Sequence, residues 1–289
     1  MTYDLHIGDR TFSSWSLRGW LVFTKFGLPC RVRMTGLYSG RLAEDLEPLA
    51  PARFVPVMRT PDGIVCGDTL AMAETLAERH PQAGLWPADP AARALARWMV
   101  AEMHSGFGAL RSDCPMQLLH RYEGFAPSDA VLADVARIES LWSLARDRHG
   151  DGGPWLFGAY SLADVFYAPV AARIAGYGLP VGEEAAAYVA LTLADTEFRQ
   201  WRAQGLTISY DPVPYAMDLP TAPWPGPSPR PARAVEGTGA ENAACPYSGK
   251  PVTDVLEIDG RRIGFCNPGC RDKTVNDPEA WPAFMALLG

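Results

Sequence analysis

The sequence predicts a small mixed α/β domain, then an all-helical domain, then a short cysteine-containing module. Three observations predict this organisation. Strand-like and helix-like segments alternate over residues 3–80, helical periodicity alone continues from residue 89, and three of the six cysteines lie in the last forty-five residues. A chain of 289 residues is long enough to give the first two regions cores of their own.

The α/β region begins with an alternating apolar run over residues 3–8, which is typical of a strand. A helix follows, with apolar positions at helical spacing from Leu17 until Gly27 ends it. Residues 30–34 are predicted to form a second strand, and residues 41–49 a short irregular helix. The order of elements therefore indicates a mixed sheet with helices packed on it.

A β-hairpin and a capped helix complete this region. Residues 54–59 and 63–66 read as strands because the Pro-Asp-Gly sequence at 61–63 is a strong turn signal. Pro56 lies inside the first of them, where proline removes a ladder donor. It is either an ordinary edge-strand proline or part of a cis peptide bond that turns the backbone toward a ligand. Asp68 or Thr69 is expected to cap the helix that follows.

The second region reads as helices only. His104, Phe107 and Arg111 share a stripe along the first of these helices, which is long. Ser161 and Asp164 form a capping box before a nearly all-apolar helix, which is expected at the buried centre of a bundle. The predicted helices span residues 91–111, 128–149, 162–175, 183–191 and 195–203.

The last eighty residues contain a proline-rich stretch followed by a second region of strand and helix patterns. Residues 211–243 hold eight prolines, which indicates an extended linker or a strap along the surface. Two strand-like runs then flank an Asp-Gly turn at residues 259–260, and a final helix is expected from about residue 278.

Three serines, Ser13, Ser14 and Ser16, lie where the first strand passes into the first helix. A helix N-terminus presents free N–H groups and a positive dipole end, which stabilise an anion by roughly 0.3–2 kcal/mol. Serine is also among the residue types most favoured as an N-cap. One serine can close the helix while its neighbour faces an anionic sulfur, so both roles stay open.

Composition excludes several classes of function. A net charge of −7 argues against nucleic acid or an anionic membrane as the main partner. The chain has no apolar run of about 20 residues and no signal-peptide pattern at its start, so we expect a cytoplasmic protein. In that compartment the cysteines are expected to be thiols or metal ligands rather than disulfides.

Four features in this order resemble the glutathione S-transferase superfamily over about residues 3–210, in particular its serine-dependent, zeta-like bacterial members. The sequence over residues 13–18 looks like their active-site turn, and Val55-Pro56 falls at their cis proline. Asp68 and Thr69 fall where these proteins bind the γ-glutamyl group of glutathione. The capping box resembles the cap of their folding nucleus.

This resemblance implies a thioredoxin-like glutathione-binding domain over residues 1–80, a helical transferase domain over 86–210 and a linker over 211–243. Ser13 is then the catalytic residue that donates a hydrogen bond to the glutathione sulfur, with Ser14 and Ser16 as alternatives. A thiol with a pKa near about 8.5 needs such help to lose its proton at neutral pH.

The resemblance also assigns the remaining contacts. Asp68 and Thr69 are expected to bind the γ-glutamyl amine and carboxylate, and the Val55 backbone the cysteinyl amide, beside Pro56. Phe54 stands where many members have a basic residue and Ala50 where asparagine is usual, so the contact with the glycine end departs from the family pattern. The expected electrophile pocket is lined by Trp15, His104, Phe107 and Arg111.

The activity implied is that of a homodimeric glutathione transferase attacking a small electrophile, with no nucleic acid or membrane partner. One alternative is a non-catalytic relative that uses its tail to bind or sense a metal. Another is a glutathione-dependent isomerase of the maleylacetoacetate type, against which the absence of cysteine from the serine turn counts.

Residues 244–289 resemble the TRASH/YHS-like metal-binding modules, through Cys245, Cys266 and Cys270 and their spacing. Three thiolates suit Zn²⁺ or a soft ion such as Cu(I). All five histidines precede residue 150, so the fourth ligand is Asp254, Asp272, a water, or absent. The alternative is a packed hairpin–helix unit with reduced cysteines.

Overall fold

The computed structural model describes residues 2–237 and 239–289. The chain divides into two compact units, the first comprising residues up to 193 together with 217–225, and the second comprising 194–216 and 226–289. The boundaries of these units differ from the domain limits expected from the sequence. The helix that begins at residue 196 belongs to the second unit, together with the tail. Within the described residues, no helix is both long and apolar enough to cross a membrane.

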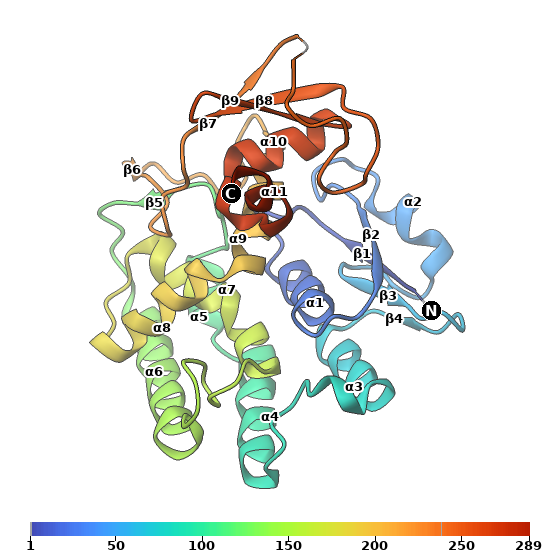
Figure 1. Cartoon of the computed structure of the whole chain (residues 1–289). Helices are drawn as coiled ribbons and strands as arrows, with labels where there is room; N and C mark the ends of the chain where they lie inside the picture. The colour runs from blue at the N-terminus through green and yellow to red at the C-terminus, as the bar shows by residue number, and fades with distance from the viewer. Residues whose placement is uncertain (1, 238) are drawn as a thin grey trace. The chain divides into compact units, whose positions relative to one another are not determined.

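The first unit begins with a four-stranded mixed sheet in the order β2-β1-β3-β4. β1 pairs in parallel with β2 and antiparallel with β3. Helices α1 and α3 lie side by side against this sheet (Figure 1). The predicted thioredoxin-like arrangement is confirmed. The elements are β1 (Tyr3–Ile7), α1 (Ser14–Lys25), β2 (Cys30–Met34), α2 (Leu42–Leu46), the 3-10 turn η1 (Glu47–Leu49), β3 (Val57–Arg59), β4 (Val65–Cys66) and α3 (Thr69–Arg79).

Helices follow, as predicted, and α7 lies at their centre. Nearly every residue of α7 is buried, and this helix contacts both α4 and α1 (Figure 1). A helix that is apolar all round can only be stable in such an interior position. The elements are the 3-10 turn η2 (Pro81–Ala83), α4 (Pro90–Ser105), α5 (Gly108–Asp113), α6 (Asp129–His149), α7 (Leu162–Tyr177) and α8 (Glu183–Ala194).

The continuous helix predicted over residues 91–111 is wrong, because α4 ends at Ser105 and α5 starts again at Gly108. Gly106 is extended, and a Cβ atom there would lie 2.6 Å from the Glu102 carbonyl oxygen. Phe107 has a left-handed backbone (φ 53°). The apolar periodicity continues through this break, which is why the sequence pattern does not reveal it.

The predicted capping box at the start of α7 is confirmed. The buried Asp164 carboxylate accepts hydrogen bonds from the Ser161 backbone N–H (2.8 Å) and hydroxyl (3.1 Å). It also accepts from the Leu156 N–H and the Tyr188 hydroxyl, both at 3.1 Å. One carboxylate therefore joins the helix start to the preceding loop and to α8.

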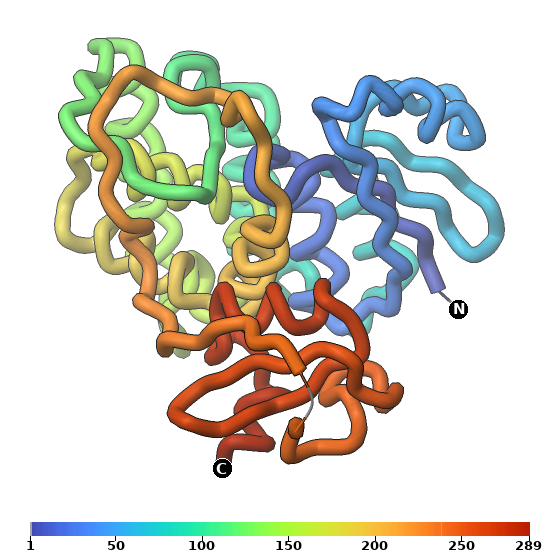
Figure 2. Tube along the Cα trace, turned by 90° about the horizontal axis from the view of Figure 1, so that it is seen from above, coloured from blue at the N-terminus to red at the C-terminus, as the bar shows by residue number. Residues whose placement is uncertain are grey.

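The proline-rich segment contributes short strands to both units. Within the first unit, β6 (Thr221–Ala222) pairs with β5 (Arg121–Tyr122), and Figure 2 shows this orange stretch passing beside the green one. Within the second unit, β7 (Ala232–Val235) pairs with β8 (Asp254–Ile258). The segment is therefore a strap with two paired stretches.

The second unit has a three-stranded antiparallel sheet, β7-β8-β9, with helices packed on it. Its core includes Leu256, Phe265 and Phe284, all fully buried. Arg199 on α9 forms a two-point ion pair with Asp277 (2.9 and 2.7 Å). The elements are α9 (Thr196–Gly205), β8 (Asp254–Ile258), β9 (Arg261–Phe265), α10 (Pro268–Asn276), the 3-10 turn η3 (Pro278–Ala280) and α11 (Pro282–Leu288). α10 was not anticipated from the sequence.

Asp164 generates a prediction about pH and stability. Burial raises the pKa of this carboxyl from 3.8 to about 6, and the hydrogen bonds it accepts oppose that rise. Between about pH 4 and pH 6, the Asp164 carboxyl is therefore protonated in the folded protein but ionised in the unfolded chain. The contribution of Asp164 to the free energy of unfolding should fall by about 2–3 kcal/mol across this range as the pH rises, and stay level above it.

Urea unfolding of the wild type and of Asp164→Asn at pH 4, 5, 6 and 7 measures this contribution. The variant is expected to be less stable throughout, because its amide N–H₂ meets donors rather than acceptors. The difference between the two proteins should shrink as the pH rises from 4 to 6. Parallel curves across this range would contradict the prediction.

Candidate functional site

The serine turn at the start of α1 is held together by two of its serines. Ser13 is the N-cap, and its hydroxyl oxygen accepts from the Ser16 N–H (3.3 Å). The Ser13 hydroxyl donates to the Ser16 hydroxyl oxygen (2.8 Å), which also accepts from the Gly8 N–H (2.9 Å). Both side chains are buried. Ser13 and Ser16 therefore close the helix and tie it to the end of β1.

Ser14 is placed differently, because it is the first residue of α1 and is half-buried. Its hydroxyl oxygen accepts a hydrogen bond from the Arg173 guanidinium on α7 (3.4 Å). That contact uses the oxygen as an acceptor and leaves the hydroxyl proton available for another group. Ser14 is thus the serine of this turn best placed to donate to an anion.

Two further guanidiniums surround the turn. Arg18 is buried in α1 and donates to the Phe166 carbonyl oxygen (2.9 Å) and the Ser14 carbonyl oxygen (3.3 Å). Its guanidinium carbon lies 4.4 Å from the centre of the Trp15 ring, and that of Arg111 lies 5.0 Å from the same ring. Trp15 is therefore in contact with two cations, a recognised stabilising arrangement.

The three guanidiniums act on one another electrostatically. Burial lowers the pKa of Arg18 well below its ordinary value, and the positive charges of Arg173 and Arg111 lower it further. A negative charge brought close to Ser14 would relieve this repulsion. The turn therefore combines a helix N-terminus, a free hydroxyl proton and a positive potential, which together suit an anion.

Asp68 links the start of α3 to α4. One carboxylate oxygen caps α3 by accepting from the Leu70 N–H (2.8 Å) and the Ala71 N–H (3.0 Å). The other lies 3.2 Å from His104 Nε2, and the His104 ring lies 5.1 Å from the Trp15 ring. The Asp68 side chain is half exposed, so a ligand can still reach it.

Two buried polar atoms beside this pair have no hydrogen-bond partner among the described residues. They are the hydroxyl oxygen of Thr69 and Nδ1 of His104. A buried polar group without a partner is costly, which makes such atoms candidates for contacts with a ligand. Thr69 was predicted to bind a carboxylate, and its unused hydroxyl fits that role.

The Val55–Pro56 peptide bond is cis, as one of the two sequence interpretations expected. Pro56 packs tightly on α1, because a Cβ atom at Gly19 would lie 2.9 Å from its ring. Phe54 differs, with 76% of its surface exposed. The structure therefore holds Pro56 against the first helix, packs Val55 with Leu46 and Leu49, and leaves Phe54 in solvent.

Of the four residues predicted for the electrophile pocket, three lie together in the structure and one is placed differently. The structure brings Trp15, His104 and Arg111 together by ring and cation contacts. Phe107 is buried as the N-cap of α5, in place of the helix-stripe position expected for it. Sequence reasoning missed Arg173, although it is the one charged residue that follows the capping Asp164 in the otherwise apolar α7, and a charge in such a helix is a signal of function.

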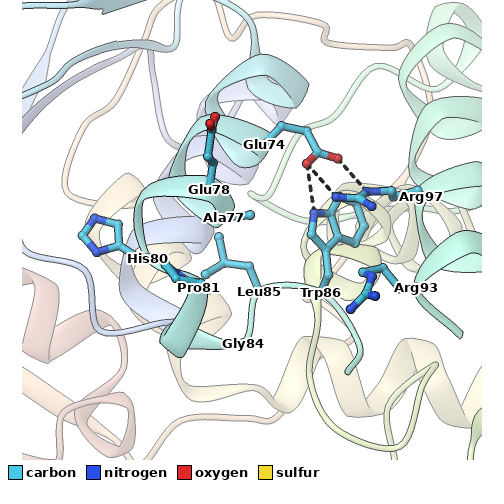
Figure 3. A pocket seen from close by; sticks show the side chains of 10 residues that line it. All are labelled: Glu74, Ala77, Glu78, His80, Pro81, Gly84, Leu85, Trp86, Arg93 and Arg97. Carbon is cyan, nitrogen blue, oxygen red and sulfur yellow. Dashed lines mark hydrogen bonds and ion pairs between the residues drawn. The ribbon is translucent and has the colours of Figure 1, made fainter. Parts of the chain in front are cut away.

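A cavity of about 490 Å³ lies elsewhere in the first unit (Figure 3). The Glu74 carboxylate binds Arg97 through two contacts (3.0 and 3.1 Å) and accepts from Trp86 Nε1 (3.3 Å). None of the sequence-predicted site residues lines it. The full lining is Glu74, Ala77, Glu78, His80, Pro81, Gly84, Leu85, Trp86, Arg93 and Arg97.

The three tail cysteines converge in the second unit. The Sγ atoms of Cys245, Cys266 and Cys270 all lie within 4.8 Å of one another. Burial raises the pKa of Cys245, but hydrogen bonds from the Tyr247, Cys266 and Ser248 backbone outweigh this and lower it to about 6. Burial and the neighbouring Cys245 raise the pKa of Cys270 to about 11. The donor set is one that thiophilic ions prefer.

The carboxylates suggested as a fourth ligand are engaged elsewhere. Asp254 pairs with Arg271 (3.2 Å), and Asp272 pairs with the same guanidinium (2.7 Å). Within the residues that the structure describes, the candidate metal group contains the three cysteines alone.

Comparison with known proteins agrees with this architecture. Residues 12–79 match the family model described as glutathione S-transferase, N-terminal domain. The chain is 30% identical over 142 residues to a probable maleylacetoacetate isomerase of Caenorhabditis elegans. That match covers 49% of this chain and 65% of the relative, so the chain spans just under two thirds of the length of that curated protein.

Solved structures show the same fold. A glutathione transferase homolog from Burkholderia gl BGR1, with bound glutathione, superposes with a TM-score of 0.54 at 24% identity, covering 72% of this chain and all of the other. A glutathione transferase from Methylococcus capsulatus gives a TM-score of 0.53 at 18% identity, over 71% of this chain and all of the other. At these identities the likeness establishes the thioredoxin-like sheet and the helical domain.

The break between α4 and α5 positions Arg111 and gives a prediction. Gly106→Ala should lower the free energy of unfolding by about 1–3 kcal/mol, because its methyl group would collide with the Glu102 carbonyl oxygen. Gly108→Ala is the matched control, since no atom lies within 4 Å of a Cβ there and alanine favours a helix. Urea unfolding of the wild type and of both variants measures the free energies of unfolding. A Gly106→Ala variant as stable as Gly108→Ala would contradict the prediction.

Proposed function

We propose that the chain is a glutathione transferase, zeta-like in its serine turn, that activates the glutathione thiolate at the start of α1 for attack on a small anionic electrophile. One observation carries the proposal. Ser14 stands at a helix N-terminus, its hydroxyl proton has no acceptor among the described residues, and it lies next to the Arg173 guanidinium and one turn from Arg18. The family match over residues 12–79 supports the same conclusion.

The first task is to make the thiolate. A glutathione thiol with a pKa near about 8.5 is mostly protonated at neutral pH, and each unit of depression needs about 1.4 kcal/mol of preference for the thiolate. The Ser14 hydroxyl supplies a hydrogen bond, and the α1 N-terminus and the nearby guanidiniums supply positive potential. Together these contributions account for a depression of one or two units.

The second task is to hold glutathione. Asp68 and Thr69 receive the γ-glutamyl amine and carboxylate, and the backbone of Val55, before the cis Pro56, receives the cysteinyl amide. Because His104 already contacts Asp68 at 3.2 Å, the ligand's ammonium group shares this carboxylate with the imidazole or displaces it. The unpartnered Thr69 hydroxyl gains the partner it lacks.

The third task is the attack itself. The sulfur donates an electron pair to the electrophilic carbon, and a leaving group departs with the electrons of the broken bond. Arg111 and Arg173 bind a carboxylate on the electrophile, with Trp15 and His104 forming the wall of the pocket. Phe107 supports this wall from the core. Ser13 and Ser16 keep the turn closed.

A glutathione-dependent isomerase is the second candidate, favoured by the relative described as a probable maleylacetoacetate isomerase. Here the thiolate adds to a conjugated double bond, the resulting single bond rotates, and the thiolate leaves again. Glutathione is regenerated, so atoms and electrons balance without a leaving group. The product distinguishes the two reactions, because only the transferase yields a stable glutathione thioether.

The remaining parts of the proposal concern assembly and the tail. The proposed functional division assigns residues 1–80 to glutathione, 86–210 to the electrophile, 211–243 to a linker and 244–289 to a TRASH/YHS-like module. It differs from the two compact units, in which residues 194–210 group with the tail. We propose a homodimer, as the family resemblance implies, and a cytoplasmic location, which six free cysteines support. A second function, zinc or copper binding by the tail, is favoured by the three converging thiols.

Replacing single serines tests the assignment of roles. Ser14→Ala should lower kcat/KM for glutathione conjugation about 10²–10³-fold and raise the pKa read from its pH–rate profile by at least one unit. Ser13→Ala should mainly lower stability, by about 1 kcal/mol, because it removes the helix cap. Conjugation rates and urea unfolding are measured on both. The assignment is wrong if Ser13→Ala shows the larger loss of activity.

The predicted preference for an anionic electrophile is tested at Arg111. Arg111→Ala should raise KM about tenfold or more for an electrophile bearing a carboxylate, and change it little for the methyl ester of the same compound. Arg97→Ala is the control, since this exposed arginine pairs with Glu74 away from the serine turn. Equal losses with acid and ester would contradict a carboxylate site.

A further inference from the structure

Strand β2 forms an open edge of the four-stranded sheet. It pairs with β1 on one side and is the last strand on the other, in the order β2-β1-β3-β4. The opposite edge, β4, has only two residues, whereas β2 has five. A strand of this length with one free side is a template for the addition of a further strand.

The backbone of β2 presents alternate residues to that free side. At one end of the strand, the Pro29 carbonyl oxygen accepts from the Tyr3 N–H of β1 (3.1 Å). At the other end, the Thr35 N–H donates to the Ile7 carbonyl oxygen of β1 (2.9 Å). Successive residues of a strand direct their backbone groups to opposite sides in the plane of the sheet, so the residues one position away from these face outward. The outward-facing residues, whose N–H and C=O groups have no partner among the described residues, are Cys30, Val32 and Met34.

The side chains on one face of this edge carry positive charge. Arg31 and Arg33 lie two residues apart on the same face, with 65% and 53% of their side chains exposed. Their Cα atoms are about 7 Å apart, because a strand rises about 3.3 Å per residue. Asp4 of β1 lies 3.6 Å from Arg31 and 4.0 Å from Arg33, but it is bound more closely by Arg59 of β3, at 2.9 Å. One carboxylate therefore serves three guanidiniums, in a chain whose net charge is −7.

Two titratable groups of β1 respond to this positive charge. The hydrogen bond from Arg59 holds the pKa of Asp4 below its ordinary value against the effect of burial, and the charges of Arg31 and Arg33 lower it further. His6 lies opposite Arg33 in the register of β1 and β2. Burial lowers the pKa of His6, and the charge of Arg33 adds to that effect. A negative charge placed beside the two β2 arginines would therefore be stabilised.

Charge also decides which kind of strand fits this edge. A second copy of β2 in antiparallel register would bring arginines against arginines, and like charges directly opposite one another are destabilising. A strand with Asp or Glu at alternate positions would instead place a carboxylate opposite Arg31 and another opposite Arg33. In an antiparallel pair these would be the positions that exchange no backbone hydrogen bonds, where facing side chains are closest.

We propose that β2 binds an extended acidic segment of a partner protein by strand addition. The segment pairs antiparallel with the outer side of β2, forms hydrogen bonds with its free backbone groups, and sets alternate Asp or Glu side chains against Arg31 and Arg33. This interaction surface lies outside the serine turn and goes beyond the proposed transferase activity.

The test measures binding of a blocked, fluorescent peptide of alternating glutamate and threonine to the full chain by fluorescence anisotropy. We expect saturable binding, and binding at least tenfold weaker for the peptide with lysine in place of glutamate. The double variant Arg31→Gln and Arg33→Gln should bind the acidic peptide about tenfold more weakly, because both cross-strand ion pairs are lost.

The matched control is the double variant Arg97→Gln and Arg137→Gln. It removes the same amount of charge from two exposed arginines of α4 and α6 and should bind the acidic peptide as the wild type does. Circular dichroism checks that both double variants fold. Equal weakening in the two double variants would overturn the proposal, because it would show attraction to overall charge rather than to the β2 edge.

Methylation of the peptide backbone tests the strand pairing without changing the protein. N-methyl groups on the threonines remove the N–H groups that face β2 and should abolish binding, whereas N-methyl groups on the glutamates face away and should leave it within about threefold. Equal binding of the two methylated peptides would overturn strand addition.

The remaining outcomes concern other occupants of the edge. Displacement of the peptide by inorganic phosphate, with no effect of methylation, would make the arginines a site for small anions and overturn the proposal. Sedimentation of the wild type with and without the peptide detects a second copy as the occupant, because a dimer that the acidic peptide dissociates would contradict a separate partner. An acidic peptide that does not bind at all would also overturn the proposal.

Discussion

The burial of two guanidinium groups between α1 and α7 is the constraint on which the first unit depends. Arg18 reaches from α1 to the Phe166 carbonyl oxygen of α7, and Arg173 reaches from α7 to the Ser14 hydroxyl of α1. A buried charge is stable only when its donors are satisfied. These contacts hold the thioredoxin-like region against the helices and place positive charge at the serine turn. The two arginines that hold these regions together therefore also supply the positive charge of the candidate site.

The second unit relies on polar anchors in a comparable way. The Arg199–Asp277 pair is largely buried and joins α9 to the end of α10, and Asn276 donates to the Ala203 carbonyl oxygen. A small sheet with three strands has little core of its own. The added helix enlarges that core, because Ala203 packs with the apolar residues of the tail. This explains why α9 groups with the cysteine module.

Much of the fold could be predicted from the sequence because its signals are local. Asp68 and Ser161 cap helices through contacts within three residues, and the turn at 259–260 needs only a short stretch of chain. The break at Gly106 could not be predicted, since the apolar pattern runs through it. Its position depends on the Glu102 carbonyl and on the burial of Phe107 in the tertiary core.

The candidate site shows the same division between local and long-range information. The serines, Asp68 and the tail cysteines are recognisable in sequence, because each belongs to a short pattern of residue types. Which serine keeps a free proton, and which cations surround it, depends on Arg173, 159 residues away.

By itself, the sequence determined the helix caps, the cis-proline candidate, the α/β-then-helical order and the three thiols. Only the tertiary structure decided that Ser13 caps while Ser14 faces Arg173, that Arg271 pairs with Asp254 and Asp272, and that α9 groups with the tail. The physical reason is the separation along the chain between the groups that interact. Caps and turns are satisfied by neighbours along the chain, whereas charge pairing and burial are settled by whichever distant groups the fold brings within a few ångströms.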